Sequence, residues 1–259
     1  ISAGRPATPV FLVRASLVID GYSPSRPVTK SFIFLDKVLT QGHPGGEWPS
    51  SPVNGQVIDL GMDPGVVNDP RYSQQMKASL TDIPSISLVT DLADMFGASR
   101  GIYVNAYQHG EEWERQCSLE LINPDNTIGF RVNAGVRIRG GASRSPDNPK
   151  HAFRLFFRKE YGPGKLLYPL FGDEGAAEFD KVDLRTEQNY SWSKEGDTHN
   201  TFLRDIFSRD TQRDMGQPYT RGRYYHLYLN GMYWGLFQTE ERPDSDYAET
   251  YFGDGDDDY

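Results

Sequence analysis

Residues 133–157 read NAGVRIRGGASRSPDNPKHAFRLFF, and this stretch decides the fold. Apolar residues and arginines alternate over VRIRG, and in AFRLFFR three apolar residues fall at every second position. A period of two is typical of strands with one buried face. The segment between them, GASRSPDNP, is dense in turn-forming residues. The stretch therefore predicts two neighbouring strands joined by a loop that starts near Gly140 and Gly141.

Strand patterns continue on both sides of this stretch. Upstream, WERQCSLELI begins at Trp113 and leads into the turn NPDNTIG, and downstream residues 179–185 read FDKVDLR. Residues 224–241, YYHLYLNGMYWGLFQTEE, contain an Asn-Gly pair at Asn230 and Gly231. Asn-Gly tolerates the positive φ angles of a two-residue hairpin turn, so this segment predicts a β-hairpin.

Residues 198–215, THNTFLRDIFSRDTQRDM, carry the one longer helical pattern. We expect Thr198 or Asn200 to cap its start and Gly216 to end it. Its apolar residues fall at helical spacing and predict one apolar face. They are Phe202, Leu203, Ile206 and Phe207.

The N-terminal part predicts a hairpin and a linker. Residues 10–19 and 28–35 are apolar runs separated by turn-rich DGYSPSRP, which indicates two antiparallel strands. Residues 40–83 are rich in Gly and Pro and predict an ordered linker with one short helix near 71–80, with a plain surface loop as the alternative. After residue 84, PSISLVTD predicts a strand and DLADMFG a short helix capped by Asp91 and Gly97.

The composition is that of a globular protein, with 37% hydrophobic and 13% aromatic residues in 259. The net charge of −9 argues against nucleic acid as a partner, and no apolar run is long enough to span a bilayer. Positive charge is nevertheless concentrated in the arginine-rich stretch between residues 137 and 158, which suggests a local anionic ligand such as phosphate. The only cysteine, Cys117, excludes an intrachain disulfide. Because residue 1 is Ile, we expect the chain to be processed or to be part of a longer protein.

Five pieces in one order carry a resemblance to a known family. They are residues 133–157, YPLFGD (168–173), LR (184–185), FLRD (202–205) and LYLNGMYWGLFQTEERPD (227–244). Together they resemble the CotH family of spore-coat-associated atypical protein kinases and their secreted relatives, over about residues 84–259. The earlier pattern RA…DGY.PS..VT..F.F is similar to the last hairpin of the Ig-like modules that end chitobiase-type enzymes.

These resemblances imply an α+β fold, namely a β-rich kinase-like N-lobe with one main helix, preceded by a β-hairpin from an Ig-like module. The implied domains are 1–39 for the end of the Ig-like module, 40–83 for the linker and 84–259 for the CotH-like kinase domain with its hinge at 240–244. In a kinase the general base and the metal-binding aspartate lie beyond the hinge. The resemblance therefore implies that the kinase domain is truncated here and that its catalytic C-lobe is missing from this chain.

The resemblance also implies ATP and Mg²⁺ as cofactors and a loop that covers the phosphates. Adjacent glycines allow close approach of the backbone, and hydroxyl and guanidinium groups are good phosphate donors. The nucleotide-binding candidates are Arg139, Gly140, Gly141, Ser143, Arg144, Lys150 and Arg154, with Lys150 favoured by position over Arg154 as the strand cation. Supporting candidates are Arg185, Arg204, Asp205 and Glu240, each of which has a structural salt bridge as its alternative. No catalytic residue and no metal ligand is assigned.

The implied activity is ATP- and Mg-dependent phosphotransfer to Ser/Thr of surface or secreted proteins, at an extracellular or cell-surface location. The implied partners are a protein substrate or neighbouring domains of a larger secreted protein, with no nucleic acid. Two alternative functions stay open: a non-catalytic extracellular module for adhesion, glycan binding or scaffolding, and a fragment with no function of its own that is held in a larger assembly. For the arginine-rich stretch, a solvated basic hairpin is the alternative to a phosphate loop. The acidic tail at 254–258 is expected to be a solvated terminus rather than a cation site. A G-x-S-x-G elbow, a Walker loop and histidines at i, i+4 spacing are all absent from the sequence.

Overall fold

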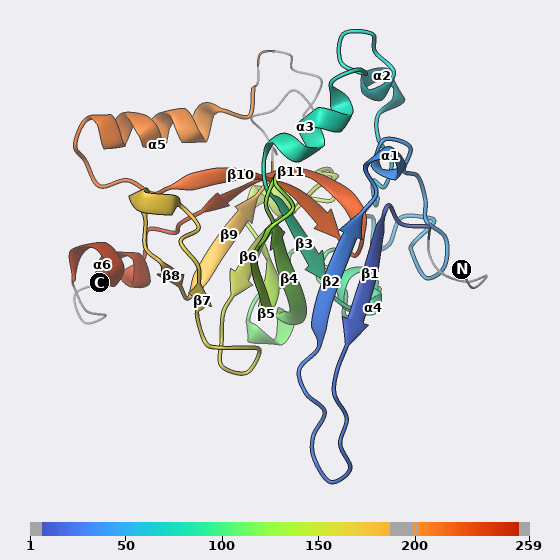
Figure 1. The fold of residues 1–259 in the computed structure, drawn as a ribbon, viewed down its shortest axis with the longest axis horizontal. Helices are drawn as coiled ribbons and strands as arrows, with labels where there is room; N and C mark the ends of the chain where they lie inside the picture. Colours follow the sequence, from blue (N-terminus) through green and yellow to red (C-terminus); the bar gives the residue numbers. More distant parts are fainter. Residues whose placement is uncertain (1–6, 187–198, 200, 254–259) are drawn as a thin grey trace.

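The centre of the molecule is a closed β-barrel, seen in the computed structural model, which describes residues 7–186, 199 and 201–253 (Figure 1). The barrel strands are β3 (Ser85–Val89), β4 (Arg115–Ile122), β5 (Ile128–Arg139), β6 (Ala152–Phe156), β9 (Lys181–Arg185), β10 (Gly222–Leu229) and β11 (Met232–Glu240). Their order is β10-β11-β9-β6-β5-β4-β3, and β3 closes the ring by pairing with β10. That closing pair is parallel, and the others are antiparallel. The expected mixture of helices and strands is confirmed, and the kinase-like arrangement stays a prediction.

The barrel core follows from the alternating sequence pattern. Val136 and Ile138 of β5, with Phe153 and Leu155 of β6, are buried, while the arginines between them are not. The rings of Phe153 and Phe237 stack inside the barrel with centroids 6.1 Å apart. Full burial of one such side chain contributes about 1.5–3 kcal/mol. The predicted strands at this stretch are therefore confirmed, and their polar faces point outward.

The Asn-Gly hairpin between β10 and β11 is confirmed. Asn230 and Gly231 have φ angles of 48° and 86°, which an Asn-Gly turn accepts with little strain. The Asn230 side chain also accepts a hydrogen bond from the Thr90 amide at 2.8 Å. The turn thereby ties the β10–β11 hairpin to the end of β3, its parallel neighbour in the barrel.

The N-terminal hairpin consists of β1 (Val10–Ala15) and β2 (Val28–Ile33). Both predicted strands exist but end earlier than the apolar runs that predicted them. The hairpin lies against β4 and β3: the Ser31 amide donates to Glu120 of β4 at 2.7 Å, and the Ser31 hydroxyl donates to Ser87 of β3 at 2.8 Å. Its derivation from an Ig-like module, and the domain boundaries at residues 39 and 83, stay predictions.

The remaining elements are short. They are α1 (Leu35–Val38), α2 (Pro64–Val67), α3 (Met76–Asp82), α4 (Leu92–Phe96), α6 (Ser245–Phe252), the small β7–β8 pair (Leu166–Leu167 and Glu178–Phe179) and the 3₁₀ turns η1 (Glu111–Trp113), η2 (Ala142–Arg144) and η3 (Gly172–Glu174). The predicted helix near 71–80 occurs as α3, shifted toward the C-terminus. Asp91 caps α4 by accepting from the Ala93 amide at 2.8 Å, and Gly97 is its C-cap, as predicted. None of the described helices has the length and hydropathy needed to cross a membrane.

Helix α5 (Arg204–Asp214) differs from its prediction in two ways. It begins at Arg204 with Leu203 as N-cap, and the expected caps Thr198 and Asn200 lie outside the described residues. Of its predicted apolar face, Phe202 is buried just before the helix and Ile206 is half-buried, whereas Leu203 and Phe207 are 54% and 72% exposed. The predicted apolar face is therefore covered only in part, and the helix itself contacts the barrel mainly through charged side chains. Gly216, with φ 70°, follows its end as predicted.

Candidate functional site

A row of charged residues crosses four neighbouring strands of the barrel. Arg137 of β5 lies opposite Arg154 of β6, Arg154 opposite Asp183 of β9, and Asp183 opposite Glu240 of β11. Directly opposite residues share one face of a sheet. The residues before and after Arg137, Arg154 and Asp183 are buried in the barrel core, so these three side chains lie on the outer face of the sheet. Glu240 lies on the same face because it is directly opposite Asp183. We call Arg137, Arg154, Asp183 and Glu240 the charged row.

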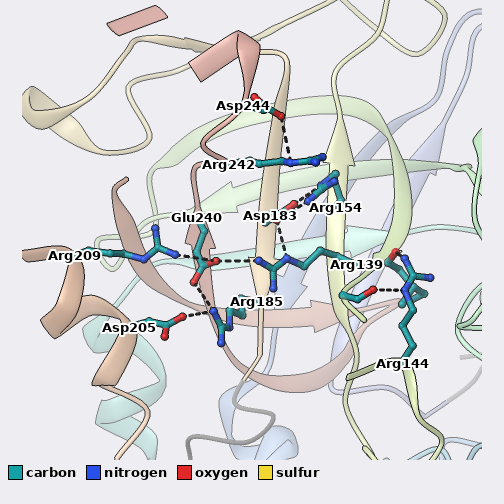
Figure 2. Close-up of polar contacts among 12 residues, drawn as sticks. Arg139, Arg144, Arg154, Asp183, Arg185, Asp205, Arg209, Glu240, Arg242 and Asp244 are labelled. Atoms are coloured by element: carbon teal, nitrogen blue, oxygen red, sulfur yellow. Dashed lines mark hydrogen bonds and ion pairs between the residues drawn. The ribbon is translucent and has the colours of Figure 1, made fainter. Parts of the chain in front are cut away.

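Asp183 is the carboxylate that holds two arginines, Arg154 of the charged row and Arg139. Arg154 donates to it through Nε at 2.5 Å and Nη2 at 2.9 Å, and Arg139 donates through Nε at 2.8 Å (Figure 2). The Asp183 side chain is 3% exposed. The hydrogen bond to Asp183 raises the pKa of Arg154 above its ordinary value. Asp183 therefore fixes the directions of both guanidinium groups.

Glu240 is the second buried carboxylate, and three guanidinium groups surround it. Arg209 of α5, Arg139 of β5 and Arg185 of β9 approach its oxygens at 3.4, 3.5 and 3.7 Å (Figure 2). These are ion-pair distances rather than short hydrogen bonds, and Oε1 of Glu240 accepts no hydrogen bond from the described residues. Burial raises the pKa of Glu240 above its ordinary value, and the three arginines act against that rise.

The loop between β5 and β6 is built around a buried arginine. Gly140 has a φ of 115°, and a Cβ there would collide with the Ser143 side chain, so glycine is required. The Arg144 guanidinium donates to the carbonyls of Ile138 (2.6 Å), Gly140 (2.5 Å), Gln108 (3.0 Å) and Ala106. Burial, and then the charge of Arg154, lower the pKa of Arg144. Arg144 therefore serves as an internal brace for the loop.

His151 anchors the other end of the loop and gives stability a pH dependence. Its ring nitrogens face the Ser143 carbonyl at 3.1 Å and the Gln56 side-chain oxygen at 2.8 Å. Burial lowers the pKa of His151 to about 4, so the folded protein keeps it neutral while the unfolded chain protonates it near 6.5. Its contribution to stability is thus complete above pH 6.5 and is lost as the pH falls to about 4, a loss of roughly 2–3 kcal/mol.

This loss is checked by urea unfolding between pH 7.5 and 4 for the wild type and His151→Gln. We expect the curves to differ in slope between pH 6.5 and 4. His109→Gln, at an exposed histidine, should follow the wild type. Parallel curves for His151→Gln and the wild type would contradict the assignment.

An open cleft of about 550 Å³ lies over the two arginines of the charged row, Arg137 and Arg154, and over the glycine turn. Its lining residues are Gln108, His109, Gly110, Trp113, Arg137, Ile138, Arg139, Gly140, Gly141, Arg144, Arg154 and Phe156. The lining thus contains four arginines and no aspartate or glutamate. Because the carboxylates that orient these arginines do not line the cleft, the cleft presents positive charge to a ligand. We call this the arginine cleft.

One side of the arginine cleft is aromatic. The guanidinium carbon of Arg137 lies 4.4 Å from the ring centre of Phe156, and Glu114 orients Arg137 through an ion pair of 2.6 Å. Trp113 lines the same cleft and is half-buried. A flat ring and an anionic group can therefore be bound side by side, the ring by stacking and the anion by guanidinium groups.

The structure distributes the sequence-predicted residues over several places. Arg139, Gly140, Gly141, Arg144 and Arg154 line the arginine cleft. Of the two candidates for the strand cation, Arg154 lines it, whereas Lys150 lies 4.0 Å above the Trp234 ring and donates to the Asp59 carbonyl at 2.6 Å. Ser143 contributes its carbonyl to His151 rather than lining the cleft.

The predicted supporting residues gather near α5. Asp205, in the first turn of the helix, forms an ion pair with Arg185, which also approaches Glu240. Arg204 is exposed at the start of the helix. Three of the four supporting candidates, Arg185, Asp205 and Glu240, therefore form one ion-pair cluster.

Sequence reasoning missed Asp183, Arg209, Trp113 and Phe156 as parts of the site. Asp183 alternates with Val182 and Leu184 in FDKVDLR, so its outward direction was predictable. What the sequence does not give is the order of strands, which places Asp183 between Arg154 and Glu240. Trp113 and Phe156 are also far apart in the sequence, so local patterns do not show that they line the same cleft.

Comparison with known families finds a similarity over the part of the chain that carries most of this site. Residues 136–259 match the family model described as CotH kinase protein. No curated protein matches the chain. The CotH match begins inside β5 and contains all four arginines of the arginine cleft, Asp183, α5 and Glu240. Trp113 and η1 precede it.

The CotH match implies a nucleotide and a divalent metal, and the cleft fits the nucleotide better than the metal. Guanidinium groups and a glycine turn suit phosphates, and Trp113 and Phe156 suit a base. Among the described residues, no group of three or more His, Cys, Asp or Glu could hold a metal ion. Asp183 and Glu240, the carboxylates nearest the cleft arginines, are occupied by guanidinium groups. A metal brought by the nucleotide's own phosphates would neutralise charge there.

Proposed function

We propose that the chain is the nucleotide-binding part of a CotH-type protein kinase, with ATP bound in the arginine cleft. The observation that carries this proposal is the lining of the cleft, which combines four arginines, a glycine turn and two aromatic rings without a carboxylate. The CotH match over residues 136–259 supports it independently.

Within this proposal each group has a distinct task. Arg139 and Arg154, fixed by Asp183, hold the phosphates, and the turn at Gly140–Gly141 lets the backbone approach them. Trp113 and Phe156 stack on the base and exclude water from one side of the cleft. These residues bind and orient the nucleotide. We assign no general base to them, because none of the cleft residues is a carboxylate.

The proposed reaction is transfer of a phosphoryl group from Mg·ATP to Ser/Thr side chains of surface or secreted proteins. The proposed partners are such a protein substrate or neighbouring domains of a larger secreted protein, and the proposed location is extracellular or at the cell surface. The family description supports the kinase class.

The test is nucleotide binding by isothermal titration calorimetry with Mg·ATP and with inorganic pyrophosphate. We expect Arg139→Gln to weaken binding of both ligands by at least tenfold, because it removes a cation that contacts phosphate. Arg158→Gln removes the same charge nearby but from a residue outside the cleft lining, and should change binding less than threefold.

A second variant separates the base from the phosphates. We expect Trp113→Ala to weaken ATP binding by about tenfold and to leave pyrophosphate binding unchanged, since a stacked base contributes about 1–3 kcal/mol. No heat of binding with millimolar Mg·ATP in the wild type would overturn the proposed function.

A further inference from the structure

Helix α5 is attached to the barrel by charge more than by apolar burial. It contributes no buried side chain, and Phe207 and the adjacent Leu203 are 72% and 54% exposed. Ile206 touches the barrel at Gly222. The helix also forms ion pairs from Arg209 to Glu240 and from Asp205 to Arg185 in the barrel (Figure 2). A third ion pair joins Arg213 to Glu174 of η3. Elements with little buried apolar surface have low local stability, so the position of α5 depends on these pairs.

Glu240 connects this helix to the arginine cleft. Its side chain is 1% exposed and lies between Arg209 of α5 on one side and Arg139 of the cleft on the other (Figure 2). The two guanidinium groups approach the same oxygen, Oε2, at 3.4 and 3.5 Å. Both cations therefore share one acceptor, and any change in how strongly one of them is held alters the hold on the other.

We propose that Arg209 is a positioning residue for the nucleotide, which acts on Arg139 through the shared carboxylate of Glu240. The inference rests on the proposed function of the arginine cleft. When Arg209 occupies Glu240, Arg139 is held there less strongly and is available to a phosphate. When a phosphate binds Arg139, Glu240 keeps its ion pairs with Arg209 and Arg185, and these pairs become stronger. Helix α5 is then held more firmly.

The two directions of this coupling are linked thermodynamically. If the nucleotide strengthens the contact between Arg209 and Glu240, the same contact must strengthen nucleotide binding by the same factor. Couplings between sites of this kind typically amount to 5–150-fold in affinity. Since the pairs here are longer than hydrogen bonds, we expect a value at the lower end.

The first measurement is affinity for Mg·ATP and pyrophosphate in variants of α5. Arg209→Gln should weaken both ligands five- to tenfold, and Arg209→Lys, which keeps the charge, should stay within threefold of the wild type. The matched control is Arg213→Gln, one turn further along the helix. Arg213 pairs with Glu174, Asp210 and Asp214 and not with Glu240, so its loss should change affinity less than twofold.

A double-variant cycle distinguishes action through Glu240 from a general charge effect. Glu240→Gln should raise affinity for both ligands, and adding Arg209→Gln to that variant should have no further effect. Hydrogen exchange provides a readout that needs no variant at Glu240: amides of residues 204–214 should exchange more slowly when Mg·ATP is added to the wild type, and not in Arg209→Gln.

The outcomes separate this inference from the proposed function. Equal effects of Arg209→Gln and Arg213→Gln, additive effects in the cycle, or unchanged exchange in α5 would overturn the coupling while nucleotide binding through Arg139 still stood. Absence of ATP binding by the wild type would overturn both.

Discussion

Replacing Arg144 by methionine is expected to lower the free energy of unfolding by about 3–5 kcal/mol, and the melting temperature by roughly 10 °C. The methionine retains much of the side-chain volume but donates to none of the carbonyls of Ile138, Gly140, Ala106 and Gln108 that Arg144 now satisfies. In the variant these buried carbonyls would accept hydrogen bonds neither from water nor from the protein, and this loss lowers the stability of the folded state. Chemical denaturation monitored by tryptophan fluorescence measures the change.

Two further variants make the result specific. Arg144→Lys should recover little stability, because an ammonium group cannot reproduce the planar fork that reaches four carbonyls in different directions. Arg71→Met removes an arginine that is 73% exposed and paired with Asp69, and should cost less than about 1 kcal/mol. If Arg144→Met kept full stability and lost only nucleotide affinity, Arg144 would be a phosphate ligand and not the brace of the loop.

Arg144 also illustrates a limit of sequence reasoning. Its residue type and its place after two glycines predict a cation near a phosphate, and the structure does place it at the cleft. The carbonyls of Ala106 and Gln108, which accept hydrogen bonds from Arg144, belong to a segment almost forty positions earlier. No local sequence pattern indicates that this segment lies next to Arg144, so the role of Arg144 in holding the loop was not predictable.

The strands themselves were predictable because the alternation of apolar and polar residues within each strand indicates which side chains are buried. Alternation over residues 136–139 and 153–157 gives both the strand and its inward face, and the Asn-Gly pair gives the turn between β10 and β11. The register of that hairpin also depends on a shift between Leu227 and Tyr228, which the turn does not predict. Closure of the barrel was not predictable in this way. It depends on the parallel pairing of β3 with β10, which joins Ile86 to Leu227 across a sequence separation that no local pattern encodes.

Helix α5 shows a different limit of sequence reasoning. Its apolar residues at helical spacing predict an apolar face, but the structure covers only part of that face: Phe202 is buried and Phe207 is exposed. Ion pairs of Arg209, Asp205 and Arg213 and an apolar contact of Ile206 hold the helix. Amphipathic spacing reports which residues share a face but not what covers that face. The charged residues of the same helix, which sequence reasoning treated as secondary, determine where it lies.

Replacing Asp183 by asparagine is expected to have opposite effects on stability and on anion affinity. The cluster of Arg139, Arg154, Arg185 and Arg209 is balanced by Asp183, Asp205 and Glu240, so the variant changes its net charge from +1 to +2. Removing one partner of a buried ion pair typically costs about 3–5 kcal/mol, because the remaining charges stay buried without compensation.

The same excess of positive charge should strengthen the binding of pyrophosphate in the arginine cleft. A fixed millimolar concentration of pyrophosphate should therefore raise the melting temperature of Asp183→Asn more than that of the wild type. Asp180→Asn is the matched control, since Asp180 is half exposed and pairs loosely with Lys165 at 3.5 Å, and it should resemble the wild type in both respects. Equal stabilisation of wild type and Asp183→Asn by pyrophosphate would mean that Arg139 and Arg154 do not face the anion, and the cleft would then lack the chemistry on which the proposed nucleotide site depends.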